Sequence, residues 1–299
     1  MSKTFYRSFK ILLVMVFCLI SLGAAVRAMD AGLACPDWPL CFGDVIPDFH
    51  PQVYFEFIHR ALAGLVAILT ITLMVVLVRK KDKVPSNIRQ LAIFSVLLLL
   101  MQVVMGGLTV LLQLHEEVVA AHLSLGTAFF GVLAWIYFSL KNAEADVSTA
   151  VKLPAVVNYF SYGALASVYM QIVLGGFVAS HYAALVCTDF PTCHGKWIPT
   201  FDGIIGLHVI HRLGAYSLAI VLACFAAFLL LNFKDSVLRK SAVALASLIV
   251  LQIAIGIANV VFMRPPIITV LHLATGTAIL GMTVLLNRRL RLVYATNKN

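Results

Sequence analysis

Residues 35–60 read CPDWPLCFGDVIPDFHPQVYFEFIHR, and residues 187–212 read CTDFPTCHGKWIPTFDGIIGLHVIHR. Both stretches hold a C-x5-C pair, then a glycine, an Ile-Pro step and a His-Arg pair, all at a constant offset of 152 residues. Farther along the chain, an offset of 150 residues pairs His122 with His272. A register this long, with several uncommon residue types, indicates a tandem duplication with halves of about 1–145 and 146–299.

The composition around these repeats is that of a membrane protein. Of the 299 residues, 62% are hydrophobic and 12% are charged, whereas soluble domains are about 45–50% apolar and about 25% charged. Helices that cross a bilayer need about 20 apolar residues, and eight runs qualify: 11–29, 53–79, 87–113, 118–140, 154–180, 204–232, 236–262 and 267–287. We therefore predict an all-α membrane protein whose eight transmembrane helices form two tandem-repeat four-helix bundles.

Lysine and arginine are distributed unevenly between the two ends of these runs. One set of ends holds 17 of the 22 cations, namely Lys3, Arg7, Lys10, Arg79, Lys80, Lys81, Lys83, Arg89, Lys141, Lys152, Lys234, Arg239, Lys240, Arg288, Arg289, Arg291 and Lys298. Because cytoplasmic loops are enriched in Lys and Arg, both termini are predicted to be cytoplasmic, in the cell (plasma) membrane. The net charge of +9 reflects this bias and attraction to the lipid bilayer rather than nucleic-acid binding, because the cations are spread among short loops.

The first apolar run has a second interpretation. Three cations precede it, as they do in a cleaved signal peptide. The duplication favours a retained helix, because removal of this run would leave the first half one span short of the second.

Four histidines lie at similar depth near the outer ends of alternate runs: His59, His122, His211 and His272. A lone histidine in a span is more often a packing residue, but two repeat-related pairs favour a function, since polar groups at that depth are costly. Imidazole is a good ligand of heme iron, and helix bundles with facing histidines commonly hold heme. Zinc fits less well, because each pair lacks further ligands at its depth.

Glu56 distinguishes the two halves. It lies three residues before His59, so both side chains share a helix face with about 4.5 Å of axial rise between them. The equivalent residue of the second half is His208, which suggests that one heme is acted upon and the other serves as a cofactor. Two alternatives stay open: Glu56 caps its helix or pairs with Arg60, and His208 rather than His211 ligates iron.

Arg60 and Arg212 follow the histidines of the two His-Arg pairs. Guanidinium groups bind carboxylates through two parallel hydrogen bonds, so contacts with heme propionates are predicted, with snorkelling to the membrane interface as the alternative. The glycines in the segments 102–107, 171–176 and 252–259 are expected to allow close approach of a helix or a porphyrin, or to serve ordinary small-residue helix packing.

The cysteine pairs Cys35–Cys41 and Cys187–Cys193 lie in outer segments, where cysteines tend to be oxidised. Two structural disulfides are expected, each closing a short ring and contributing roughly 2–2.5 kcal/mol. A redox-active Cys35–Cys41 pair is an alternative, as is a zinc site completed by His50 or His194.

These motifs together resemble the heme A synthase family over nearly the full chain, in its bacterial form with a cysteine pair in each half. The resemblance rests on E-x-x-H-R at 56–60, the second His-Arg pair at 211–212, His122, His272, both C-x5-C pairs and the duplicated eight-helix layout. It implies an oxidoreductase that converts heme O to heme A by oxidising the C8 methyl group to a formyl group through a hydroxymethyl intermediate.

The resemblance also implies a role for each half. The N-terminal half would bind the substrate heme O between His59 and His122, with Glu56 as the catalytic carboxylate. The C-terminal half would hold the cofactor, heme B with its iron, on His211 and His272. The implied partners are heme O synthase and the assembly of aa3-type terminal oxidases, and a homo-oligomer is a further candidate.

Two other functions compete with this one. A diheme b-type membrane cytochrome, which passes electrons without modifying heme, explains the histidines but leaves the difference between Glu56 and His208 without a reason. A heme transporter would need a path to the cytoplasmic side, and the inner halves of the runs contain almost no ionisable residue.

Overall fold

The computed structural model describes residues 1–143, 154–197 and 199–296. Within them the helices are α1 (Lys3–Ala28), α2 (Pro51–Arg79), α3 (Ser86–Leu111), α4 (Glu116–Ala143), α5 (Ala155–Ser180), the short 3-10 helix η1 (Ala183–Leu185), α6 (Gly203–Asn232), α7 (Ser236–Val261) and α8 (Pro266–Thr296). All eight α-helices are long and apolar enough to cross a membrane. The predicted all-α membrane fold with eight spans is therefore confirmed.

The first and last helices extend beyond the predicted apolar runs. α1 begins eight residues earlier than expected, at Lys3, because the Ser2 hydroxyl accepts a hydrogen bond from the Phe5 N–H at 3.1 Å and caps the helix. α8 continues to Thr296, and Arg289 in its basic end donates from Nε to Asp235 Oδ1 at 3.1 Å. Apolar runs locate the part of a helix that contacts lipid, whereas capping and ion pairs decide where the helix ends.

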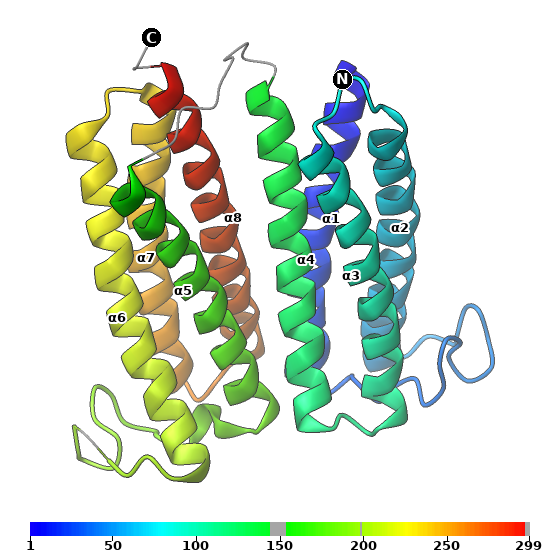
Figure 1. Cartoon of the computed structure of the whole chain (residues 1–299). Helices are drawn as coiled ribbons and strands as arrows, with labels where there is room; N and C mark the ends of the chain where they lie inside the picture. The colour runs from blue at the N-terminus through cyan, green and yellow to red at the C-terminus, as the bar shows by residue number, and fades with distance from the viewer. Residues whose placement is uncertain (144–153, 198, 297–299) are drawn as a thin grey trace.

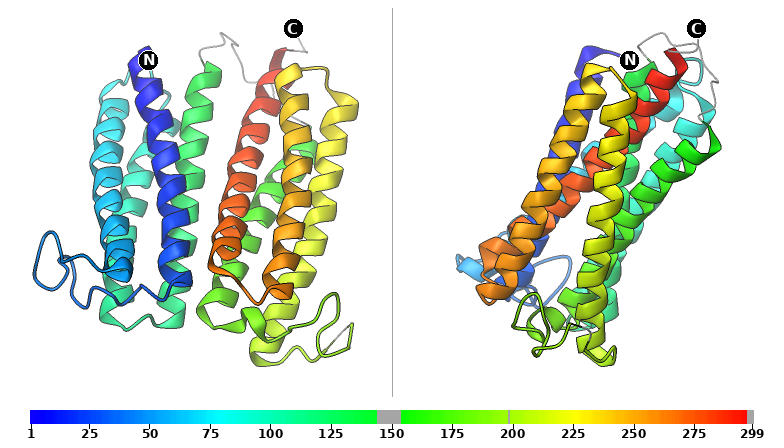
Figure 2. Two further views of the ribbon diagram at one scale, coloured as in Figure 1. Left: turned by 180° about the vertical axis from the view of Figure 1, so that it is seen from behind. Right: turned by 90° about the vertical axis from the view of Figure 1, so that its left-hand side faces the viewer.

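Each half of the chain is a ring of four helices (Figure 1). In the first half, α1 packs on α2, α2 on α3, α3 on α4, and α4 on α1, so α2 and α4 lie on one diagonal of the ring. The second half repeats this order with α5 to α8. Figures 1 and 2 show both chain termini at one end of the bundles and the two long loops, 30–50 and 181–202, at the other. The starts of α2, α4, α6 and α8 lie at the end with these loops.

The two halves pack through α1 and α4 on one side and α5 and α8 on the other. Small residues permit this approach, since a methyl group added at Gly281 would lie 3.3 Å from the Phe130 ring. Buried side chains from both halves belong to one continuous core, which includes Phe9, Leu12, Leu133, Phe225 and Leu286. The outer faces of the helices instead expose large apolar residues such as Ile68, Ile220 and Val250, as contact with lipid requires.

Candidate functional site

Each of the four candidate histidines lies against a glycine of the preceding helix. An added methyl group would come within 3.0–3.3 Å of the ring atom Cε1 in the pairs Gly23–His59, Gly106–His122, Gly175–His211 and Gly256–His272. Contacts this short require the neighbouring ring to move. The glycines therefore do allow close approach, as predicted, and the group that approaches is the imidazole of the next helix.

The imidazole rings carry nitrogen atoms that the protein leaves unpaired. Nδ1 of His59, His122 and His272 is buried and has no hydrogen-bond partner among the described residues. His211 differs, because its Nδ1 lies 3.0 Å from Nε2 of Gln171. Buried polar atoms without a partner are rare in folded proteins and call for an explanation. A ligand that engages imidazole nitrogen, such as heme iron, fits this chemistry.

The structure brings the predicted histidine pairs together across each ring of helices. His59 of α2 interacts electrostatically with His122 of α4, and His211 of α6 does so with His272 of α8. In both halves the two helices lie on a diagonal of the ring, so the imidazoles converge on its interior. Each half thus carries two half-buried imidazoles on diagonally placed helices.

Glutamines support these histidines, and the interpretation of the sequence missed them. Gln102 and Gln171 lie four residues before Gly106 and Gly175 of the histidine contacts. Nε2 of Gln171 donates to the carbonyl of His211 at 2.8 Å, and Nε2 of Gln102 donates to the carbonyl of His122 at 3.0 Å. The recurring Q-x3-G spacing, which Gln252 and Gly256 share, was the pattern that could have identified them.

Glu56 is 7% exposed and shares its helix face with His59. Its Oε1 accepts a hydrogen bond from Nε of Arg60 at 2.9 Å, which confirms the alternative in which these two residues pair. No described residue donates to the other oxygen, Oε2. The guanidinium charge offsets part of the cost of burying the carboxyl group, and its second oxygen lies beside the histidine without a described partner.

His208 occupies the position of Glu56 in the second half, and both of its ring nitrogens are engaged. Nε2 accepts a hydrogen bond from Nε of Arg212 at 2.8 Å, which places the ring proton on Nδ1. Nδ1 then donates to the carbonyl of Ala183 at 2.7 Å. Iron ligation by His208 would break one of these bonds, so His211 is the better candidate ligand.

Arg60 and Arg212 hold the two cysteine loops against the bundles. Arg60 donates from Nη1 to the carbonyls of Asp37 and Leu40 at 2.7 and 2.6 Å, and from Nη2 to that of Cys35 at 3.3 Å. Arg212 makes the equivalent bonds to the carbonyls of Cys187, Asp189 and Thr192. In the structure, both guanidinium groups therefore bind loop carbonyls. Their contact with heme propionates stays a prediction.

The four outer cysteines form the disulfides Cys35–Cys41 and Cys187–Cys193. The expected disulfides are therefore confirmed, and the zinc alternative is wrong because each sulfur is bonded to another sulfur. The structure does not test the redox-active alternative for Cys35–Cys41.

A carboxylate organises the turn inside each disulfide loop. In the first loop, Asp37 accepts hydrogen bonds from the N–H groups of Phe42 and Gly43. In the second loop, Asp189 accepts the equivalent bonds from the N–H groups of His194 and Gly195. The backbone bond from Gly43 is the main cause that lowers the pKa of Asp37. For Asp189 the main cause of a lowered pKa is the hydroxyl of Thr192. Both carboxylates thus favour their ionised form in the folded loop.

Comparison with known proteins gives a consistent result. The family described as COX15-CtaA, cytochrome oxidase assembly protein, matches residues 7–52 and 45–284. A heme A synthase of Shewanella oneidensis is 32% identical over 92% of this chain and 93% of its own length. A heme A synthase of Shouchella clausii is 31% identical over 82% of this chain and 83% of its own length. A heme A synthase of Paracoccus denitrificans is 26% identical over 96% of this chain and 88% of its own length.

We predict that the second disulfide loop loosens in acid. Because the folded-state pKa of Asp189 is lowered, its carboxylate stabilises the folded loop above the unfolded value of about 4, and this contribution is lost as the pH falls through the folded-state pKa. Hydrogen-exchange protection of the His194 and Gly195 amides should fall accordingly in the wild-type protein. In Asp189→Asn, protection should be low at every pH. Asp202→Asn serves as the control, because the Asp202 side chain caps no amide; an unchanged profile in Asp189→Asn would contradict the prediction.

A second prediction concerns crowding at the histidines. Gly175→Ala places a methyl group 3.0 Å from Cε1 of His211, and overpacking of this kind costs about 1–3 kcal/mol. The thermal unfolding midpoint in detergent should therefore fall. Gly163→Ala on the same helix meets nothing within 4 Å, so its midpoint should stay level or rise through better helix propensity. Equal midpoints for the two variants would show that the ring is not crowded.

Proposed function

The chain belongs to the COX15-CtaA family of cytochrome oxidase assembly proteins, and we propose that it is a heme A synthase. In this function it is an oxidoreductase that converts heme O to heme A. The C8 methyl group of the porphyrin is oxidised to a formyl group through a hydroxymethyl intermediate. Relatives that carry the name heme A synthase cover most of the chain, in accord with this function.

One observation favours a heme-modifying enzyme over a cytochrome that only passes electrons. The two halves share their histidines, glycines and arginine networks, yet the residue bonded to Nε of the arginine is a carboxylate in one half and an imidazole in the other. Electron transfer alone needs no such difference. A reaction at one of two similar hemes does need a reactive group in one half only.

The N-terminal half is the proposed substrate site, where His59 and His122 ligate the iron of heme O. Their positions on the two diagonal helices of one bundle, close enough to interact electrostatically, support this assignment. Heme O bound there would lie beside Glu56, which shares the helix face of His59.

The C-terminal half is the proposed cofactor site, where His211 and His272 hold heme B. Bound there, heme B would supply one-electron transfer, because two histidine ligands leave no open position on the iron. Gln171 orients His211 through both its Nδ1 and its carbonyl. Contacts of this kind around a ligand histidine fix its ring plane, which supports His211 as a ligand.

Glu56 acts on the methyl group of heme O. Oxidation would pass electrons from this carbon to an external electron acceptor and would leave positive charge conjugated with the macrocycle. A fixed carboxylate stabilises that charge, accepts the proton and orients an attacking water molecule. Oε2 is the oxygen available for this role, because Oε1 is held by Arg60. The bond to Arg60 also orients the carboxylate before substrate binds, so little reorganisation is needed during the reaction.

The orientation in the cell follows from the distribution of cations. We place both termini in the cytoplasm and the two disulfide loops outside the plasma membrane, since most Lys and Arg lie at the end of the bundles with the termini. The proposed heme sites then lie near the outer face. Heme O synthase and the assembly of aa3-type terminal oxidases remain the proposed partners, with a homo-oligomer as the proposed quaternary state.

Glu56→Gln tests the catalytic role directly. The amide oxygen still accepts the bond from Arg60, so the loop network is kept, but the negative charge and the proton acceptor are lost. Conversion of heme O to heme A, measured by chromatography of extracted hemes, should fall by at least about 100-fold. Glu117→Gln, at an exposed carboxylate on α4, is the matched control and should retain wild-type conversion. A wild-type rate in Glu56→Gln would rule out the role of Glu56.

Histidine variants test the assignment of the two halves. Purified His272→Ala should lose most of its heme B, measured as the pyridine hemochrome, because one of two iron ligands is gone. His122→Ala should keep heme B and lose bound heme O. Full retention of heme B in His272→Ala would refute the cofactor site. A wild-type protein that holds heme B only, even when heme O is supplied, would favour the electron-passing cytochrome.

A further inference from the structure

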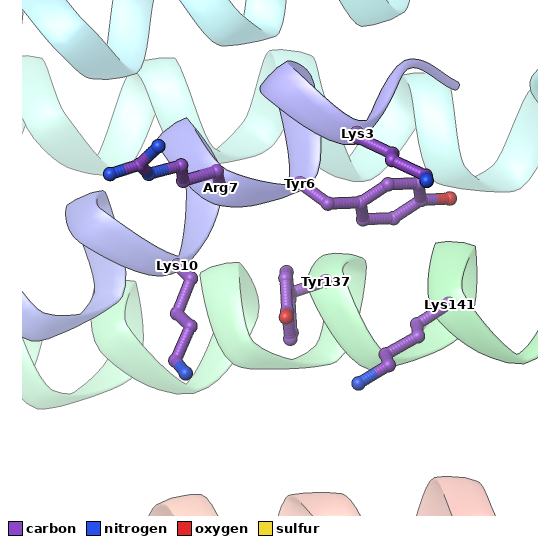
Figure 3. Close-up of a pocket in the computed structure, with 6 residues that line it drawn as sticks. All are labelled: Lys3, Tyr6, Arg7, Lys10, Tyr137 and Lys141. Atoms are coloured by element: carbon purple, nitrogen blue, oxygen red, sulfur yellow. The ribbon is translucent and has the colours of Figure 1, made fainter.

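A cavity of about 330 Å³ lies between α1 and α4, at the end of the bundles that carries the termini (Figure 3). Its lining residues are Lys3, Tyr6, Arg7 and Lys10 of α1, with Tyr137 and Lys141 of α4. The heme function described above uses none of these residues. The cavity is at the opposite end of the helices from the four histidines, so it is a separate site.

The charge of this cavity is positive. Four of the six lining residues are cations and none is acidic. Within the part of the chain that the structure describes, none of the four cations forms an ion pair. Topology alone explains why cations gather on this face of the protein, but it does not explain why four of them line one cavity. Such a cluster attracts an anion with several acceptor oxygens.

Tyr137 provides an unused donor at the cavity. Its side chain is only 8% exposed, and its ring packs edge-on against Phe9, with centroids 5.7 Å apart. The hydroxyl of nearby Tyr6 donates to the carbonyl of Leu140 at 3.2 Å, but no described residue bonds to the hydroxyl of Tyr137. The ring is therefore buried while the hydroxyl is open to the cavity, where it can bond to a bound group. Figure 3 shows the Tyr137 side chain between those of Lys10 and Lys141, where a bound anion would meet all three.

We propose that this cavity binds the phosphate of an anionic phospholipid headgroup. Arginine and lysine are the usual partners of phosphate, the first through paired hydrogen bonds and the second as a point charge. Basic pockets between transmembrane helices on the cytoplasmic side are suited to such headgroups, because that leaflet is rich in anionic lipid. The cavity lies at the ends of the spans, at the depth of headgroups, and on the side that we propose to be cytoplasmic.

The neighbouring surface favours a lipid over free phosphate. Ile11 and Val14 continue the helical face of Arg7 and Lys10 one turn deeper into the membrane, and both are largely exposed. They would contact the acyl chains of a lipid whose headgroup fills the cavity. A lipid bound there would join α1 to α4 and so close the ring of the N-terminal half at the end away from the histidines.

The test compares two variants of the full-length protein with the same loss of charge. Lys3→Gln, Arg7→Gln and Lys141→Gln together remove three cations of the cavity. Lys80→Gln, Lys81→Gln and Lys83→Gln together remove three exposed cations from the α2–α3 loop on the same face. Retention of phosphatidylglycerol relative to phosphatidylcholine is measured by native mass spectrometry. In the cavity variant this relative retention of phosphatidylglycerol should fall by at least about ten-fold. In the loop variant it should stay within about two-fold of the wild-type value.

Tyr137→Phe provides a test that leaves charge and topology unchanged. It removes only the hydroxyl and should reduce phosphatidylglycerol retention by about five-fold, so the proposal stays testable even if the triple cavity variant fails to fold. Equal losses in the cavity and loop variants, or no loss in Tyr137→Phe, would overturn the proposal. Protection against thermal unfolding should be seen with short-chain phosphatidylglycerol and not with inorganic phosphate. Equal protection by both would identify a site for free anions and overturn the assignment to lipid.

Discussion

The contact of a histidine ring with a glycine on the preceding helix is the feature on which the rest of the structure depends. It occurs four times, with an added methyl group at 3.0–3.3 Å from the ring in every case. Each of these contacts sets the distance between the two helices that it joins, which are α1 and α2, α3 and α4, α5 and α6, and α7 and α8. Lipid supplies no hydrophobic force between helices, so close packing at small residues is what holds them together. Nδ1 of His59, His122 and His272 has no hydrogen-bond partner among the described residues, whereas Nδ1 of His211 lies 3.0 Å from Nε2 of Gln171.

A second constraint connects the bundles to the outer loops. Arg60 and Arg212 each donate to three loop carbonyls and to one side chain four residues earlier on the same helix. In the first half that side chain is Glu56, and in the second it is His208. The duplication thus kept the whole network and changed one acceptor. A buried carboxylate is costly without a cation beside it, so the arginine that anchors the loop also makes a carboxyl group tolerable next to the proposed heme ligand His59.

The two ends of the molecule have opposite chemistry. Imidazoles, a carboxylate and two disulfide loops occupy one end. At the other end, the cavity is lined by Tyr137 and by four cations that form no ion pair among the described residues. Helices of 26 to 31 residues separate the two ends, which amounts to about 40 Å. Both ends nevertheless involve α1 and α4, since Gly23 and His122 face one site while Arg7 and Lys141 line the other. The ring of the N-terminal half is therefore defined at both ends by side chains from these two helices.

The sequence by itself determined the eight spans, the duplication, the histidine pairs and the disulfide pairs. The spans follow from hydropathy, and the duplication, the histidine pairs and the disulfide pairs follow from the spacing of residues along the chain. All of these can be recognised without knowing how the helices pack. Tertiary structure decided the rest. Arg60 bonds to carbonyl groups 20 to 25 residues away, and backbone carbonyls carry no mark in a sequence. His208 is bonded to Arg212 and to the carbonyl of Ala183 in a different element, and these bonds, which favour His211 as the proposed ligand, carry no mark in the sequence. The basic cavity exists because Tyr6 and Leu140, which are 134 residues apart, meet where α1 packs on α4. Packing between helices so far apart in the chain depends on the complementary shapes of their surfaces, which no local sequence pattern specifies.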